Sequence, residues 1–194
     1  KMAKQTKKRD DEVLFDLVEA GQSTQNFVEK YQSWIIGVVA GILGVIGIYF
    51  AYKMIYLAPK ETEAMEELYR AELRFEQDSF ALALEDPGEG YKGFLDIAED
   101  YSMTKAGNLA NYYAGISYLN LGRYKAAIAY LNDFNPTGNV TPILKFGALG
   151  DAHSELTEFD KAISYYKKAV NSEANEYMTP YYLQKLGLLY RTLQ

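Results

Sequence analysis

Side chains that could do chemistry are few in this 194-residue chain. His153 is the only histidine and cysteine is absent, so a zinc site would need mostly carboxylates and no disulfide or thiolate site can form. The GEG sequence at 88–90 lacks the preceding strand and following lysine of a phosphate-binding loop. Clustered acids such as Glu63, Glu66 and Glu67 are interpreted as a solvated helix face. We therefore expect a non-enzymatic protein without metal, cofactor or small-molecule substrate.

The longest apolar stretch, residues 34–52, contains no charged side chain. A helix of this length covers the roughly 30 Å hydrocarbon core of a bilayer. Tyr31 lies before the run and Trp34 begins it, while Tyr52 ends the run and Tyr56 follows it. Aromatic rings at both ends are expected at a membrane interface. A buried core helix or a cleaved signal peptide is the alternative, but a signal peptide has a shorter apolar region nearer the terminus. The pattern predicts one retained membrane helix over 34–57.

Charge is distributed unevenly on the two sides of this stretch. Residues 1–9 carry five Lys or Arg and no acid, whereas the chain from Glu61 carries twelve Lys or Arg against twenty Asp or Glu. The positive-inside rule then places the N-terminus in the cytoplasm and the acidic domain outside it. A basic tail for nucleic acid is the alternative, but the acidic domain disfavours it, so contact with membrane lipid is the expected role.

Small residues recur every three or four positions inside the membrane stretch, which gathers most of them on one side of a helix. Such a face lets a second membrane helix approach closely, although glycine is common in membrane helices in any case. The residues expected to pack against a partner helix are Gly37, Gly41, Gly44, Gly47 and Ala51.

Residues on both sides of the stretch have helical apolar patterns. Within 1–33, the basic head and an amphipathic segment are expected at the cytosolic surface, lying on lipid headgroups or docking a partner. Pro59 suits the first turn of a new helix, which is predicted to run to about Leu84 with Ala64, Leu68, Ala71 and Phe75 inward. A second helix is expected over Tyr91–Tyr101, with Phe94, Leu95 and Ala98 inward.

From Asn108 the sequence repeats with a period of 35 residues. Small and large residues keep their places between the two copies, and a third copy opens with Gly187 and Tyr190, 37 residues after Gly150. His153 occupies the position of Tyr118 and Tyr190, which favours a packing role over a catalytic base. The first copy holds Gly115, Tyr118, Gly122, Tyr124, Ala127, Ile128 and Leu131, and the second holds Gly150, His153, Thr157, Phe159, Ala162, Ile163 and Tyr166.

These two stretches, YYAGISYLNLGRYKAAIAYL and FGALGDAHSELTEFDKAISYYKKA, resemble the tetratricopeptide repeat, which pairs antiparallel helices through small residues. The resemblance implies an all-α fold, in which residues 58–194 form an α-solenoid of three to four helix pairs. Tyr91–Tyr101 would be the second helix of a degenerate earlier repeat. The last repeat is incomplete, so the native protein is expected to continue.

The whole layout resembles the YfgM-type ancillary subunits of the bacterial Sec translocon. Its most suggestive stretch is FVEKYQSWIIGVVAGILGVIGIYFAYK, where an aromatic head with Glu and Lys runs into a Gly-rich anchor. The resemblance implies a single-pass protein of the bacterial inner membrane with a periplasmic domain. It also implies partnership with a SecYEG-type channel and a PpiD-type membrane-anchored chaperone, handling exported polypeptides.

A solenoid of this kind binds other proteins on the inner surface formed by the first helix of each pair. Tyr, Leu and acid at these positions favour amphipathic or basic segments over a free C-terminal carboxylate. The expected function is a membrane-anchored scaffold. The alternatives are a chaperone-like holder of unfolded clients and a structural adaptor of another secretion or motility complex. The candidate partner-binding residues are Leu109, Tyr112, Ile116, Leu119, Asn120, Leu144, Asp151, Ser154 and Glu155.

Overall fold

The computed structural model describes residues 31–172 and 175–193. Every regular element in these ranges is a helix, which confirms the all-α fold class. The basic head and most of the amphipathic segment lie outside the described residues. The chain divides between Lys53 and Met54 into two compact units, which are described one at a time.

The membrane stretch lies in a helix that runs from Tyr31 to Glu76. It is the one helix of the described ranges that is long and apolar enough to span a membrane, with a mean hydropathy of 2.3 over its most apolar window. No residue of that window is buried within the protein. Such exposure of apolar side chains is unfavourable in water.

Helix geometry changes where this stretch meets the second unit. A π-helical turn, Tyr52–Leu57, precedes α2 (Ala58–Glu76), whose first turn contains Pro59. Proline has no N–H for the carbonyl four residues earlier and its ring crowds that carbonyl. The wider π turn is one way to accommodate the ring within a helix. Helix α2 thus starts next to Pro59, as expected, but the backbone remains helical from the π turn into α2.

The expectation that the helix after Pro59 continues to Leu84 is wrong. Helix α2 ends at Glu76, and a short α3 (Phe80–Glu85) follows a turn in which Asp78 has a positive φ of 54°. The predicted second helix over Tyr91–Tyr101 is shorter, because α4 covers Phe94–Asp100. Ala64, Leu68 and Ala71 are buried as expected, and Phe94 and Ala98 of α4 are buried as well.

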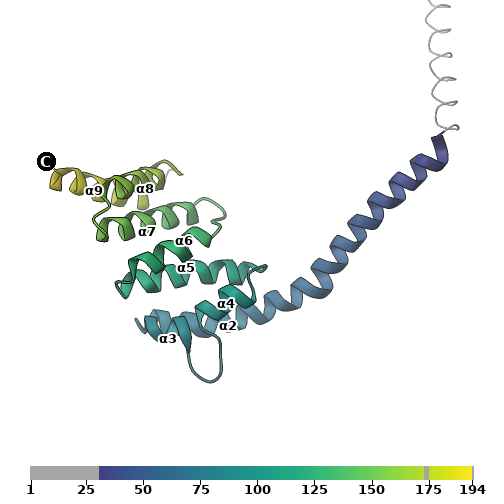
Figure 1. Ribbon diagram of the computed structural model, residues 1–194, viewed down its shortest axis with the longest axis horizontal. Coiled ribbons are helices and arrows are strands. Elements are labelled where there is room, and N and C mark those ends of the chain that lie inside the picture. Colours follow the sequence, from purple (N-terminus) through teal and green to yellow (C-terminus); the bar gives the residue numbers. More distant parts are fainter. Residues whose placement is uncertain (1–30, 173–174, 194) are drawn as a thin grey trace, which may run out of the picture. The chain divides into compact units, whose positions relative to one another are not determined.

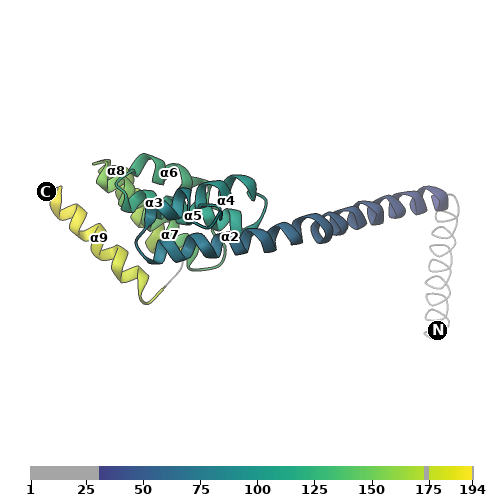
Figure 2. The same ribbon diagram turned by 90° about the horizontal axis from the view of Figure 1, so that it is seen from below.

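Five longer helices complete the second unit: α5 (Lys105–Asn120), α6 (Tyr124–Asp133), α7 (Thr141–Glu155), α8 (Phe159–Ser172) and α9 (Met178–Thr192). Figure 1 shows them following one another in successive layers after α2, α3 and α4. In Figure 2, α9 is inclined to the other helices at the C-terminal end of the stack.

Three helix pairs, α2/α3, α5/α6 and α7/α8, are joined by the same turn. After α5, the N–H of Arg123 donates to Tyr118 O at 2.8 Å, and the N–H of Gly122 donates to Leu119 O at 3.1 Å. These are the two bonds of a Schellman motif, which requires a left-handed residue after the helix. That residue is Gly122 (φ 72°), Thr157 (φ 58°) or Asp78 (φ 54°) in the three turns. The turn at Asp78 shows that α3, rather than Tyr91–Tyr101, is the second helix of the first pair.

Small residues let the paired helices approach closely. A Cβ added to Gly115 would lie 2.6 Å from Leu131 Cγ, and one added to Gly150 would lie 2.5 Å from the Tyr166 ring. Ala71, at the matching position of α2, is fully buried. Gly187 is the corresponding residue of α9, where an added Cβ meets nothing within 4 Å.

Aromatic rings join the first pair to the helices that follow it. The Phe75 ring lies 5.3 Å from Phe80 and 5.1 Å from Tyr113, in edge-to-face geometry. Tyr113 stacks on Phe94 at 5.1 Å, so one cluster connects α2, α3, α4 and α5. Burial and the nearby Glu72 carboxylate raise the pKa of Tyr113 to about 12. The phenol therefore stays neutral in the core at ordinary pH.

Acidic residues of α2 bind the next layer, although Glu63 and Glu66 are exposed as predicted. Glu67 accepts a 2.7 Å bond from the Lys92 N–H, and Glu63 bonds the Tyr101 hydroxyl. Glu61 accepts from the N–H groups of Lys105 and Ala106, which are unsatisfied donors at the start of α5. Glu67 is partly buried, whereas Glu63 and Glu66 are exposed.

The two equivalent glycines Gly150 and Gly187 allow a matched test of helix packing. We expect Gly150→Ala to destabilise the domain by about 1–3 kcal/mol, because the new methyl group collides with Tyr166. Gly187→Ala should instead stabilise it by up to about 1 kcal/mol, because alanine favours the helix and the site is open. Urea unfolding of the full chain in mild detergent, followed by circular dichroism, measures both. Equal effects of the two substitutions would contradict the packing described.

Candidate functional site

An open hollow of about 510 Å³ lies among α5, α6, α7, α8 and α9. Its walls combine aliphatic, aromatic and charged side chains from these five helices, a mixture that is typical of protein-binding surfaces. We call it the α7–α9 hollow. It is lined by Leu119, Tyr124, Asp151, Ser154, Glu155, Phe159, Tyr166, Lys185, Leu188, Leu189 and Thr192.

Four of the nine predicted binding residues line this hollow: Leu119, Asp151, Ser154 and Glu155. The other five lie elsewhere. Leu109 packs against the first hydrophobic cluster, and Tyr112 and Ile116 pack against the cluster around Leu131. Asn120 is exposed and donates to Ile116 O at 2.9 Å, while Leu144 is partly buried near the start of α7.

Seven residues that line the hollow were not predicted as binding residues: Tyr124, Phe159, Tyr166, Lys185, Leu188, Leu189 and Thr192. Leu188 and Thr192 follow Asp151 and Glu155 by the same 37 residues that relate Gly187 to Gly150, so the repeat could have found them. Tyr124 and Phe159 are the first residues of α6 and α8 and are also related by the repeat. No sequence pattern indicated Lys185, because its role depends on how α9 packs.

Asp151 is the polar centre of the hollow. Its Oδ1 accepts from Lys185 Nζ at 2.6 Å and from the Tyr166 hydroxyl at 2.7 Å, which joins α7, α8 and α9. Burial alone would lower the pKa of Lys185, but its bonds with Asp151 and Tyr181 outweigh burial and raise that pKa. Burial and the Asp151 carboxylate both raise the pKa of Tyr166. The carboxylate is thus held by two donors that remain protonated.

Glu155 supplies a second carboxylate at the rim. It accepts a 3.2 Å bond from the Tyr124 hydroxyl of α6, and this bond raises the pKa of Tyr124. The Lys185 ammonium compensates the Asp151 carboxylate, whereas the Glu155 carboxylate accepts its bond from a neutral hydroxyl. A ligand in the hollow would therefore meet one negative charge beside apolar surface from Leu119, Phe159 and Leu188.

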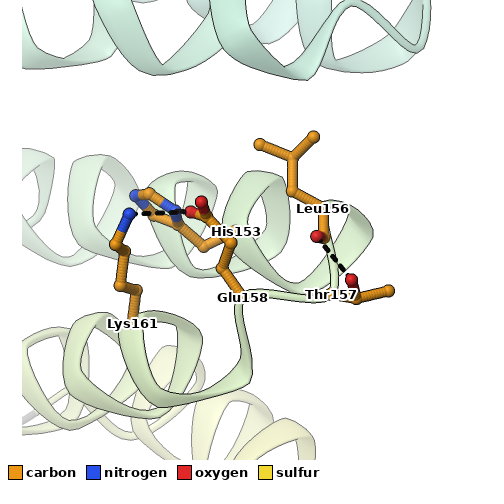
Figure 3. Close-up of polar contacts among 5 residues, drawn as sticks. All are labelled: His153, Leu156, Thr157, Glu158 and Lys161. Atoms are coloured by element: carbon orange, nitrogen blue, oxygen red, sulfur yellow. Dashed lines mark hydrogen bonds and ion pairs between the residues drawn. The ribbon is translucent and has the colours of Figure 1, made fainter.

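His153 lies outside the hollow and packs within the second repeat. It is buried, stacks on Tyr165 with ring centres 5.1 Å apart, and its Nδ1 lies 2.6 Å from Glu158 Oε2. Figure 3 shows Lys161 reaching the same carboxylate, at 3.0 Å, beside the turn through Thr157. These contacts lower the pKa of Glu158, the bond from His153 most strongly. The cluster ties the start of α8 to α7 and stabilises their turn.

The loop at 88–90 forms a tight turn. Gly88 and Gly90 have positive φ, and the Gly88 N–H donates to Asp86 Oδ1 at 2.9 Å. Arg74 Nε donates to Pro87 O at 2.8 Å, which fastens the loop to α2. Within residues 31–172 and 175–193, no three His, Asp or Glu side chains gather in a way that could hold a metal ion.

The predicted packing face of the membrane stretch is open within its own unit. A Cβ added to Gly37, Gly41, Gly44 or Gly47 would meet nothing within 4 Å, and Ala51 is exposed. The backbone is therefore accessible along this side of the helix. Comparison with protein families, with curated proteins and with solved structures finds no significant match. The interpretation of the α7–α9 hollow and of the glycine side of the apolar helix thus depends on the residues that form them.

Removing the Asp151 carboxylate tests whether it holds three helices together. We expect Asp151→Ala to lower the free energy of unfolding by about 1–2 kcal/mol, because Lys185 and Tyr166 both lose their acceptor. The control is Glu66→Ala, at an exposed position of α2. It should change the free energy of unfolding by less than about 0.5 kcal/mol. Urea unfolding in mild detergent measures both. A loss no larger than that of the control would show that the Asp151 bonds do not stabilise the domain.

The His153–Glu158–Lys161 cluster predicts a pH-dependent contribution to stability. Because the folded-state pKa of Glu158 is lowered, its contribution is complete above the unfolded pKa of about 4.3 and is lost as the pH falls through the folded value. Glu158→Gln should therefore be less stable than the original chain at pH 6–7, and the difference should disappear only when the pH falls below the lowered folded-state pKa of Glu158. Thermal unfolding across this range measures the difference, with Glu66→Gln as the control. A difference independent of pH would exclude this assignment.

Proposed function

We propose that this chain is a non-enzymatic, membrane-anchored scaffold whose helical domain binds other proteins of the bacterial envelope. In this proposal the stretch 34–57 crosses the inner membrane once, with the N-terminus in the cytoplasm and residues 58–194 in the periplasm. The chain acts as an accessory subunit of a SecYEG-type export channel together with a PpiD-type chaperone. The observation that carries the proposal is an exposed apolar helix in the same chain as a helical domain with an open hollow.

The apolar helix supports anchoring. Trp34, Ile36, Leu43, Val45 and Ile48 are 58–73% exposed, which a soluble helix of this length would not tolerate. The uncharged stretch matches the hydrocarbon thickness, and the excess of Lys and Arg in residues 1–9 supports the N-in orientation. The open glycine side suits close contact with another membrane helix, such as one from a channel.

The paired helices support a tetratricopeptide domain. Three pairs share one Schellman turn, and two of them share a glycine directly beneath a large side chain of the second helix. Domains of this kind bind protein segments on the surface lined by their first helices. Here that surface includes Asp151, Ser154 and Glu155 of α7 with Leu188 and Thr192 of α9.

The chemistry of the hollow indicates the kind of segment that fits it. Leu119, Phe159 and Leu188 offer apolar contact, while Glu155 leaves one negative charge at the rim. An amphipathic segment with a Lys or Arg beside its apolar residues satisfies both features. Contact over so small a hollow is expected to be weak, and anchoring compensates for this because confinement to one membrane raises the effective concentration.

Site-specific photo-crosslinking in intact cells tests the proposal. A photoreactive amino acid at Ser154 lies in the hollow, whereas one at Ala129 lies on the exposed side of α6 and is the matched control. We expect a few discrete adducts with membrane or periplasmic proteins at Ser154 that are absent at Ala129. An adduct smear that disappears when translation is stopped would favour the chaperone-like holder instead. Equal adducts at both positions, or none, would contradict a binding role for the hollow.

A further inference from the structure

A second cavity lies where the loop between α3 and α4 returns to α2. It has a volume of about 180 Å³ and is lined only by residues within 70–91. Figure 1 shows α2, α3 and α4 at one end of the stack and α9 at the other, with this loop projecting from the first end. We call the cavity the arginine cleft, because Arg70 and Arg74, one turn apart on α2, line it. Its other lining residues are Leu73, Gln77, Pro87, Gly88, Glu89 and Tyr91.

The guanidinium of Arg70 is oriented without using its hydrogen bonds. Its central carbon lies 4.7 Å from the centre of the Tyr91 ring. Stacking on an aromatic face fixes the plane of a guanidinium but leaves its N–H donors available. The Nε atom of Arg70 is buried and has no hydrogen-bond partner in the part of the chain that the structure describes. A buried donor without an acceptor is unfavourable, and an acceptor that binds Nε and the adjacent Nη together removes this cost.

The guanidinium of Arg74 is held by the loop and by its own helix. Its Nε donates to Pro87 O at 2.8 Å and its Nη1 donates to Gln77 Oε1 at 3.3 Å. Its Nη2 lies beside Gly88, where an added Cβ would be 3.4 Å away. Among residues 31–172 and 175–193, neither Arg70 nor Arg74 forms an ion pair with a carboxylate. Two fixed guanidiniums thus line one cavity with their charges uncompensated.

The charges in the cleft determine the sign of its ligand. Arg70 and Arg74 are opposed by the single carboxylate of Glu89, which is exposed. Like charges four residues apart on a helix repel each other, and an anion bound beside both removes this repulsion. A carboxylate matches the planar edge of a guanidinium and accepts two parallel N–H bonds from it. The cleft therefore suits an anionic ligand with a planar pair of oxygens.

Three features favour a carboxylate on a polypeptide over a phosphate. Phosphate sites recruit backbone N–H groups, but here the N–H of Gly88 donates to Asp86 Oδ1 at 2.9 Å and that of Tyr91 donates to Gly88 O. Glu89 repels a dianion more strongly than a monoanion, and it can accept a bond from a peptide N–H. Leu73 adds an apolar wall on which an aliphatic chain can pack.

We propose that the arginine cleft binds a carboxylate of a partner polypeptide. Arg70 pairs with the carboxylate through the edge of its guanidinium, and Arg74 adds a second positive charge. The carboxylate is that of an Asp or Glu side chain or that of a C-terminus. The cleft shares no lining residue with the α7–α9 hollow, so this site is separate from the surface of the scaffold proposal.

Nuclear magnetic resonance of the full chain in mild detergent, with ¹⁵N-labelled arginine, tests the proposal through the Nε–H signals. The probes are capped tripeptides at constant ionic strength. Acetyl-Ala-Glu-Ala-amide carries a side-chain carboxylate, acetyl-Ala-Ala-Ala carries a terminal carboxylate, and acetyl-Ala-Gln-Ala-amide carries neither. We expect saturable shifts of the Arg70 and Arg74 signals with a carboxylate peptide, and at least about tenfold weaker binding of the Gln peptide. The exposed Arg123 should show no saturable shift. The tighter of the two carboxylate peptides identifies the source of the carboxylate.

A matched pair of variants tests the geometry. Arg70→Lys keeps the charge but loses the planar edge, so it should weaken binding of the carboxylate peptide about tenfold or more. Arg123→Lys, at an exposed position, should leave binding within about twofold. Backbone amide spectra show that each variant is folded.

Three results would overturn the proposal: no saturable shift with either carboxylate peptide, equal shifts with the Gln peptide, or unchanged binding by a folded Arg70→Lys chain. Inorganic phosphate is titrated under the same conditions. Tighter binding of phosphate than of both carboxylate peptides would overturn the choice of a carboxylate.

Discussion

Close approach of two helices at a residue without a bulky side chain is the interaction on which the domain depends. Gly115 and Gly150 each lie beneath a large side chain of the following helix, at distances that a Cβ would not allow. Dispersion contacts between such surfaces are individually small and become large only when the helices interdigitate. The glycine costs helix propensity, roughly 1 kcal/mol relative to alanine, and the packing of Leu131 or Tyr166 offsets it.

The turn between paired helices fixes which faces meet. A Schellman motif ends each first helix with a left-handed residue, and the next helix then begins two residues later. Gly122 adopts this backbone conformation without strain, whereas the same conformation is strained at Thr157, because its side chain is β-branched. The bonds of Glu158 to His153 and Lys161, immediately after that turn, compensate by fastening α8 to α7. The same Schellman turn is thus stabilised by glycine in one pair and by side-chain bonds in another.

Much of the helical fold was predictable because burial follows a helical period and the repeat aligns its copies. The glycines, the aromatic residues opening α6 and α8, and the buried alanines were all read from sequence spacing. The break at Asp78 was missed because aspartate adopts a left-handed backbone less often than glycine and gives a weaker stop signal. Comparing Asp78 and Phe80 with Gly122 and Tyr124, 44 residues later, would have revealed it.

The polar contacts were harder to predict because their partners come from distant segments. Glu67 and Lys92 are 25 residues apart, and Asp151 and Lys185 are 34 apart, so no local pattern relates them. For the same reason only four of the nine predicted binding residues reached the hollow. A repeat places equivalent residues on equivalent faces, but whether that face is open depends on the next helix in the stack. Tyr112 shows this: its equivalent in α7 is Gly147, over which Tyr182 of α9 packs, while Tyr112 itself is partly buried against Phe134.

The same reasoning explains why the hollow and several exposed apolar side chains lie at α9. Between α2 and α8 each helix is covered by the next, and the first layers also bind each other through carboxylates of α2. Helix α9 is packed through Tyr182 and Leu189 on one side only. Of its other residues, Leu188 and Thr192 line the hollow, and Leu183 and Tyr190 are exposed. Leu183, Leu188 and Tyr190 leave apolar surface exposed on α9, which is unfavourable in water.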